Sequence, residues 1–358
     1  MTGDWWEYLL IFVVSAGLCW FLTPVAIRLA IRTGVMDQPG GHKGHRSPVP
    51  YLGGMAIVVS FAGSVAVAAI IRPPHSGIDE LVVVLALAVG LAVVGLLDDL
   101  WDLSPLVRLI LEIGAGFALW QVGAGVQIVG SGWVDVVVTV FWVVGVTNAF
   151  NLLDNMDGLA AGLAGIACLG YFAIAATNGQ YLVAGLSMGL AGCALGFLRH
   201  NFHPARIYMG DGGALFLGFL VAYLGIKLRF DGARSVSFLV PVVVCSVAIL
   251  DTTLVTVSRL VTGRSPFEGG RDHMSHRLVK LGLPVRVAVA SVYSAAVGIS
   301  VLALVASRVD QVSAWILAVL VGLTLFVVGV LLWFVPVYPE SRSRHFAITE
   351  QPEVPGAG

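Results

Sequence analysis

Apolar residues occur along this chain in long, nearly uninterrupted runs rather than with the alternation of a soluble helix or strand. Runs of about 20 apolar residues are long enough to cross the hydrocarbon core of a bilayer as α-helices. Short polar or glycine-rich breaks separate the runs, so we expect an all-α, polytopic membrane protein with about 10 to 11 transmembrane helices. The spans are expected near residues 5–27, 52–71, 80–97, 105–122, 133–150, 159–176, 181–198, 212–227, 236–258, 286–307 and 313–335.

The charges that flank the first run predict its orientation. Asp4 and Glu7 precede it, whereas Arg28 and Arg32 follow it, which is the order of a retained helix with its N-terminus outside. With eleven spans, fifteen of the twenty Lys and Arg residues fall on the side that then faces the cytosol. The positive-inside rule therefore predicts a multi-pass protein of the inner or plasma membrane with its site on the cytosolic side.

Composition agrees with a lipid environment. Of the 358 residues, 58% are hydrophobic and 11% are charged, whereas soluble domains carry about 25% charged residues. The net charge is -1 and no basic domain stands out, so the composition does not indicate a nucleic-acid-binding protein. We expect a single domain over residues 1–338 and a disordered tail over residues 339–358, which is polar and contains three prolines.

Acidic residues on the predicted cytosolic side lie in three glycine- or asparagine-rich motifs. These are GLLDDLWDLSP at 95–105, TNAFNLLDNMDGLAAG at 147–162 and YMGDGGALFLG at 208–218. Each motif falls where an apolar run meets the predicted cytosolic interface. Because the connecting loops are short, we expect all three motifs to face one shallow pocket.

The first motif contains the adjacent carboxylates Asp98 and Asp99. Two neighbouring carboxylates repel each other and need a cation or a shared proton. Arg108 supplies one positive charge, and a divalent metal would supply more. An isolated Asp-Asp pair is also compatible with ordinary interfacial charges at the end of a span.

The second and third motifs favour a metal–phosphate site. Asn148, Asn151, Asp154 and Asp157 recur at a spacing of three, so on a helix they would share one polar face. Hard oxygen ligands without a thiolate suit Mg²⁺, or Mn²⁺, rather than zinc. Asp211 lies in a glycine-rich turn before a span, where a helix N-terminus favours phosphate. The alternative for the second motif is a helix cap or an interhelical hydrogen-bond patch.

Two basic segments on the same side are candidates for phosphate binding. Their motifs are GHKGHRSPVPYLGG at 41–54 and GGRDHMSHRL at 269–278, with candidate residues Lys43, His45, Arg271, His273, His276 and Arg277. Arginine suits bidentate phosphate recognition and lysine acts as a point charge. The alternatives are a positively charged loop for the first segment and zinc binding by His273 and His276 for the second.

Asp251 differs from the other acidic residues because it lies about 12 Å into a span, counted from Arg259 at the helical rise. An acidic residue at that depth is costly and requires a reason. A buried partner on another helix and a direct role in the site are both open.

Together these motifs resemble the polyprenyl-phosphate N-acetylhexosamine-1-phosphate transferases, the superfamily that includes the WecA, TagO and MraY enzymes. The resemblance runs from Asp37 to about Leu283 and is greatest to the WecA-like branch. It rests on six motifs in the family's order, the three acidic motifs together with DQPGGHKGHRSPVPYLGG, PVVVCSVAILDT and RDHMSHRL. Six motifs in order are far more specific than any one alone.

The resemblance implies a transferase of cell-envelope glycan synthesis that uses Mg²⁺, a UDP-sugar and polyprenyl phosphate, and it suggests a homodimer. By position, Asp98 and Asp99 match the family's catalytic acidic pair, and Asp211 matches its metal-binding aspartate. Asn151, Asp154 and Asp157 match the nucleotide- and metal-binding motif. The same alignment matches Lys43, His45 and Arg108 to basic positions of the family, and Arg271, His273 and His276 to its late basic loop.

Two departures from the family pattern concern the sugar. Asn155 stands where the family usually has glycine, and Ser275 interrupts the usual pair of adjacent histidines. The histidine-rich motif of the MraY branch is absent, which argues against a MurNAc-pentapeptide donor. UDP-GlcNAc is the leading donor, and UDP-GalNAc or another N-acetyl sugar remains open.

A secondary transporter is the main alternative of a different class. Transporters place ionisable residues near the midplane of the membrane, often in repeated halves. Here only Asp251 lies deep and the halves of the chain do not repeat. A phosphatidyl-type transferase with a CDP-activated donor is a closer alternative, but its DGxxAR-like signature is absent.

Overall fold

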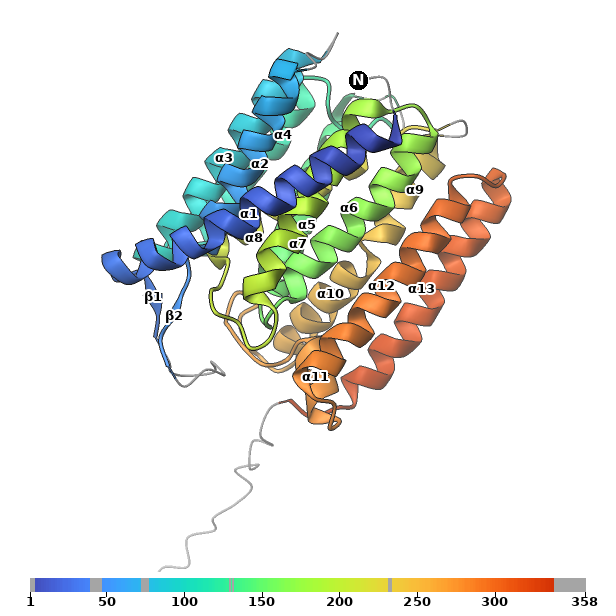
Figure 1. The fold of residues 1–358 in the computed structure, drawn as a ribbon. Coiled ribbons are helices and arrows are strands. Elements are labelled where there is room, and N and C mark those ends of the chain that lie inside the picture. The colour runs from blue at the N-terminus through green and yellow to red at the C-terminus, as the bar shows by residue number, and fades with distance from the viewer. Residues whose placement is uncertain are drawn as a thin grey trace, which may run out of the picture.

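The computed structural model describes residues 4–38, 47–71, 77–128, 130, 132–230 and 234–337. It is an all-helical bundle with one small hairpin, as the sequence predicts (Figure 1). Lys43, His45 and the predicted disordered tail at 339–358 lie outside the described residues. The elements are α1 Trp5–Thr33, β1 Met36–Asp37, β2 Val49–Pro50, α2 Gly53–Ile71, α3 Ile78–Trp101, α4 Pro105–Gln121, α5 Gly132–Leu153, α6 Leu159–Thr177, α7 Tyr181–Asn201, α8 Gly210–Lys227, α9 Arg234–Val244, α10 Ser246–Val261, α11 Met274–Lys280, α12 Val285–Ala306 and α13 Gln311–Trp333.

Most of the predicted spans are single helices. Within the described ranges, nine helices are long and apolar enough to cross a membrane, and α9 with α10 forms a tenth candidate that bends by 66°. The predicted span at 236–258 consists of two helices, because it breaks at Cys245, four residues after Pro241 inside α9. Proline removes a backbone donor and is a common cause of a kink. The predicted span at 105–122 corresponds to α4, a helix of 17 residues.

The centre of the bundle is formed by α7 and α8. In α8, 83% of the residues of the apolar window are buried inside the protein, whereas in α13 the figure is 11%. Figure 1 shows α12 and α13 side by side at one edge, with α2, α3 and α4 at the opposite edge. The outer helices therefore present apolar side chains to lipid, and the inner helices present them to one another.

Glycines allow α1 to lie directly on α7 although the two helices are far apart in sequence. A Cβ atom at Gly192 would lie 2.4 Å from the carbonyl oxygen of Phe12, and one at Gly196 would lie 2.3 Å from that of Ala16. Small residues at such contacts let membrane helices pack backbone against backbone. This contact fixes α1 across the face of the bundle.

The polar motifs gather at one end of the bundle, which we call the polar end. It contains the α3–α4 turn, the α5–α6 turn, the segment before α8 and the residues between α10 and α12. The β1–β2 hairpin lies at this end as well, because the chain after β2 bonds to the segment before α8 through Gly53 N to Tyr208 O (3.0 Å) and Tyr208 N to Pro50 O (2.8 Å).

Candidate active site

The acidic cluster comprises Asp98, Asp99, Asp211 and the cation Arg108. The two aspartates of α3 occupy its last turn, Arg108 lies in the first turn of α4, and Asp211 lies in the first turn of α8. Gly95 allows the start of α8 to lie against α3, because a Cβ there would come within 2.4 Å of the Asp211 carbonyl carbon. Three elements that are distant in sequence thus bring their charges together.

Asp98 and Asp99 have different partners although they are adjacent. The Nη1 group of Arg108 donates to Oδ2 of Asp98 and to Oδ2 of Asp211, so one guanidinium joins the two carboxylates. Asp99 accepts from the backbone N–H of Asp211 (3.1 Å) and of Gly212 (3.5 Å) at the start of α8. Asp98 therefore faces the charged centre, and Asp99 holds the N-terminus of α8.

The predicted polar face of the second motif is only partly correct. Helix α5 ends at Leu153, so Asp154 and Asp157 lie in the following turn rather than on a continuous helix face. Asn151 lies next to Asp211, and its buried Nδ2 has no partner of good hydrogen-bond geometry. Asn148 points elsewhere, because its Nδ2 donates to a carboxylate on α4.

Asp154 and Asp157 have different surroundings and different contacts. Burial raises the pKa of the Asp154 carboxyl well above its usual range, and the negative charges of Asp211 and Asp99 raise it further. Asp154 therefore lies close to the acidic cluster, and a cation bound there would favour its ionised form. Asp157 instead accepts from His203 Nδ1 (2.7 Å) and from the backbone N–H of Ala205 (2.9 Å), which ties the α5–α6 turn to the segment after α7.

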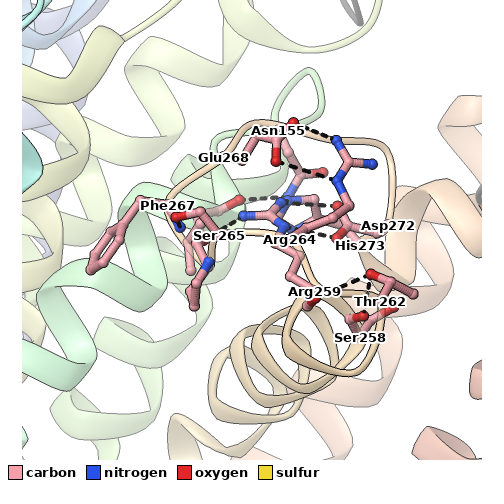
Figure 2. A network of polar contacts seen from close by, with 12 residues as sticks. Asn155, Ser258, Arg259, Thr262, Arg264, Ser265, Phe267, Glu268, Asp272 and His273 are labelled. Atoms are coloured by element: carbon pink, nitrogen blue, oxygen red, sulfur yellow. Dashed lines mark hydrogen bonds and ion pairs between the residues drawn. The ribbon is translucent and has the colours of Figure 1, made fainter.

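The late basic segment, residues 259–280, is held by buried ion pairs (Figure 2). Arg259 donates two hydrogen bonds to Asp272, at 2.8 and 2.9 Å, and both side chains are almost fully buried. Asp251 accepts from His273 Nδ1 (2.8 Å) and from the backbone N–H of Met274 (2.6 Å). The open question about Asp251 is thus answered, because it is the buried partner of this segment.

Two of the predicted phosphate-binding residues in this segment are wholly or partly buried, and a phosphate-binding role for them stays a prediction. Arg277 is 1% exposed and donates to backbone oxygens of Asp272, Leu332 and Val335, so it joins the segment to the end of α13. Burial lowers the pKa of His276 to about 4, and the charges of His273 and Arg271 act in the same direction. His276 is therefore uncharged at neutral pH and offers hydrogen bonds rather than a positive charge to a diphosphate.

Arg271 is exposed, as is Lys280 at the end of the segment, and a phosphate-binding role for Arg271 stays a prediction. The rings of His273 and His276 lie 6.3 Å apart between centroids. In the described part of the chain no third histidine, cysteine or acidic side chain joins them in a metal-binding group, so the zinc alternative gains no support.

The two departures from the family pattern contact each other. Ser275 donates to Oδ1 of Asn155 at 2.8 Å, and Asn155 also donates to the carbonyl of Leu152 at 2.7 Å. This bond joins the turn of the second acidic motif to the late basic segment. The sequence indicated each departure, but not that they form one contact.

The donor set fits a magnesium ion that is shared with a substrate. The candidate ligands Asp211, Asn151 and Asp154 offer only hard oxygens, and Asp98 and Asp211 already face one cation. Among the described residues no three acidic or histidine side chains form a complete metal-binding group. Mg²⁺ is usually held by one or two carboxylates together with substrate phosphates and water, which is the kind of site that this cluster offers.

Sequence reasoning missed two residues that adjoin the cluster. Tyr51, just after β2, donates its hydroxyl to the carbonyl of Asp99 at 2.5 Å. Glu112 on α4 is 1% exposed and accepts from Asn148. The signal for Glu112 was present, because an ionisable residue inside an apolar span deserves a functional hypothesis by default.

Comparison with known proteins identifies the relatives of this chain. The family model for glycosyl transferase family 4 matches residues 81–229. A Bacillus subtilis protein named probable undecaprenyl-phosphate N-acetylglucosaminyl 1-phosphate transferase is 32% identical over 92% of this chain and 90% of its own length. The chain belongs to glycosyl transferase family 4.

Two further relatives extend this comparison. Decaprenyl-phosphate N-acetylglucosaminephosphotransferase of Mycolicibacterium smegmatis is 32% identical over 80% of this chain and 79% of its own. Undecaprenyl-phosphate alpha-N-acetylglucosaminyl 1-phosphate transferase of Escherichia coli is 25% identical over 85% of each chain. The family assignment from the six motifs is confirmed, and the chain is a multi-pass membrane enzyme of the phosphoglycosyltransferase type.

Proposed function

We propose that this glycosyl transferase family 4 enzyme transfers N-acetylglucosamine-1-phosphate from UDP-GlcNAc to a polyprenyl phosphate. The products would be polyprenyl-diphosphate-GlcNAc and UMP. The observation that carries the proposal is the cluster of Asp98, Arg108 and Asp211 at the membrane-proximal polar end. The three relatives described above are named as polyprenyl-phosphate N-acetylglucosamine transferases, which supports this sugar and this acceptor.

The proposed reaction is a direct phosphoryl transfer. An oxygen of the lipid phosphate attacks the sugar-bearing β-phosphorus, a new P–O bond forms, and the bond to the α-phosphate oxygen breaks so that UMP leaves. The second pKa of a phosphate monoester is about 6, so the acceptor is largely dianionic at neutral pH and needs no strong base. Catalysis then consists mainly of positioning and charge neutralisation.

The residues of the cluster are proposed to have different roles in this reaction. Asp211, Asn151 and Asp154 would hold Mg²⁺, which when bound supplies positive charge across the diphosphate oxygens. Arg108 would neutralise developing charge, and Asp98, which faces the same centre, would orient the acceptor phosphate or accept its last proton. Asp99 would act through the backbone of α8, whose position it fixes.

The polar end is proposed to face the cytosol. Arg28 and Arg32 lie in the last turns of α1, on the hairpin side of the bundle, and Arg259, Arg277 and Lys280 lie in the late basic segment. This excess of basic residues at one end is what the positive-inside rule expects of the cytosolic side. A homodimer is an expectation from the family and stays a prediction.

One assay tests the function. Purified protein in lipid nanodiscs would receive polyprenyl phosphate, Mg²⁺ and, in separate reactions, UDP-GlcNAc, UDP-GalNAc and UDP-glucose. We expect UMP release and a lipid-linked sugar with UDP-GlcNAc, and no product when Mg²⁺ is removed with a chelator. The absence of UMP release with every N-acetylhexosamine donor would refute the assignment.

The same assay tests the role of Asp99. Asp99→Asn should lower turnover far more than donor affinity, because the amide cannot hold both N–H groups of α8 as the carboxylate does. A variant with near-normal turnover would exclude this role. Trapping of a covalent phospho-aspartate intermediate would replace the direct scheme with a two-step one.

A further inference from the structure

Glu112 is a buried acid for which the proposed reaction has no use. It lies in α4 four residues after Arg108, one helical turn or about 6 Å along the axis. Asn148 Nδ2 donates to Oε2 of Glu112 and to the carbonyl of Val144, so one carboxylate oxygen is held in place. The other oxygen, Oε1, is buried and has no hydrogen-bond partner among the described residues. A buried acceptor without a donor costs free energy. That cost would be offset in a conformation of the protein in which a donor reaches Oε1.

Arg108 already supplies positive charge to the carboxylates that a metal ion would bind. Its Nη1 group donates to both Asp98 and Asp211. A magnesium ion on Asp211 would need the same oxygen lone pairs and would repel the guanidinium. An arginine displaced toward the bilayer without a partner would pay a large desolvation cost. Metal binding to the cluster would therefore leave Arg108 in need of a second acceptor within reach.

We propose that Glu112, held by Asn148, is the second docking position of the Arg108 guanidinium. Residues four apart on a helix are neighbours on its surface, and Glu112 lies within electrostatic reach of both Arg108 and Asp211. When a divalent cation binds the cluster in the absence of substrate, Arg108 turns from Asp98 and Asp211 to Oε1 of Glu112, and the diphosphate of the donor then draws it back for charge neutralisation. Glu112 is thus a positioning residue that acts through Arg108. The inference rests on the metal site of the proposed function.

The proposal predicts opposite effects of two variants on metal affinity. Mn²⁺ binding to purified protein in nanodiscs, without donor or acceptor, is measured by electron paramagnetic resonance. Arg108→Gln removes the competing charge and should tighten Mn²⁺ binding. Glu112→Gln removes the charged acceptor for the displaced guanidinium and should weaken Mn²⁺ binding by about fivefold or more. The double variant should bind Mn²⁺ as Arg108→Gln does, because Glu112 acts only through Arg108.

The matched control is Glu80→Gln. Glu80 is a partly buried acid at the other end of α3, bonded to Tyr223 and Lys227, and its loss should leave Mn²⁺ affinity unchanged. Glu112→Asp provides a second variant if Glu112→Gln unfolds. It keeps the charge but shortens the reach, so it should weaken Mn²⁺ binding in the same direction and by less.

Three outcomes overturn the proposal: unchanged Mn²⁺ affinity in Glu112→Gln, an equal loss in the Arg108→Gln background, or no Mn²⁺ binding to the wild-type protein. The UMP-release assay separates these failures from failure of the proposed function. Release by the wild-type protein combined with an unchanged affinity in Glu112→Gln would leave the transferase assignment standing.

Discussion

The acidic cluster and the late basic segment lie at the same end of the bundle, yet their charged side chains are paired differently. In the late segment each buried carboxylate has a dedicated partner, Arg259 for Asp272 and His273 for Asp251. In the acidic cluster one arginine serves both Asp98 and Asp211, and burial together with nearby carboxylates raises the pKa of Asp154. The late segment is thus electrostatically complete without a ligand, whereas the cluster requires additional positive charge. The difference distinguishes polar residues that stabilise the fold from polar residues that are available for substrate binding and catalysis.

The largest expected effect is at Asp211. Asp211→Asn should lower turnover by about a thousandfold or more, because it removes charge where a preorganised electrostatic site acts on the diphosphate. Measuring UMP release at saturating substrate tests this. Asp102→Asn is the matched control, because Asp102 is an exposed residue in the next turn with a φ of 52°, a conformation that asparagine tolerates. A similar loss of turnover in both variants would contradict a special role for the acidic cluster.

The second effect concerns stability. Arg259→Met leaves the buried carboxylate of Asp272 without its partner and should cost about 3–5 kcal/mol of stability. Replacing both residues together with apolar ones should recover much of that loss. Thermal unfolding in detergent measures both changes. Arg264→Met, at an exposed pair with Glu268, should change little and serves as the control. An equal shift for Arg264→Met would argue against a specific role for the buried pair.

The third effect depends on pH. Because the pKa of His276 is lowered to about 4 in the folded protein, the unfolded chain takes up a proton first as the pH falls. His276 should therefore not affect stability above about pH 6.5, and it should reduce stability as the pH falls from 6.5 to 4. Unfolding of wild-type protein and His276→Gln across this range measures the difference, on the order of 1–3 kcal/mol. Parallel pH profiles for the two proteins would contradict the assignment.

The smallest effect should come from the contact between the two regions. Ser275→Ala removes the hydrogen bond to Asn155, worth about 1 kcal/mol, and should raise the KM for the UDP-sugar about fivefold while kcat changes less. Ser291→Ala is a suitable control, because that hydroxyl bonds only within its own exposed helix. A loss confined to kcat would show that the contact serves the chemical step instead of the donor.

The sequence was sufficient for the helices and for the identity of the acidic motifs. Apolar runs of bilayer length leave little freedom in secondary structure, since unpaired backbone groups are not tolerated in lipid. The sequence did not predict the break at Cys245 or the end of α5 at Leu153, because these depend on packing and on local turns. It also could not distinguish Asp98 from Asp99. Their roles depend on which carboxylate faces the start of α8, about 110 residues farther along the chain.

The contact of α1 with α7 through Gly192 and Gly196 also has a consequence for biogenesis. Helix α1 cannot dock until its partner, about 180 residues later in the chain, has been made. At synthesis rates of about 5–20 residues per second, α1 waits on the order of 10–40 s. During that time its Ser15 hydroxyl, buried in the finished protein, lacks the cover that α7 later provides. Crosslinking of stalled nascent chains before and after α7 emerges would measure that waiting period directly.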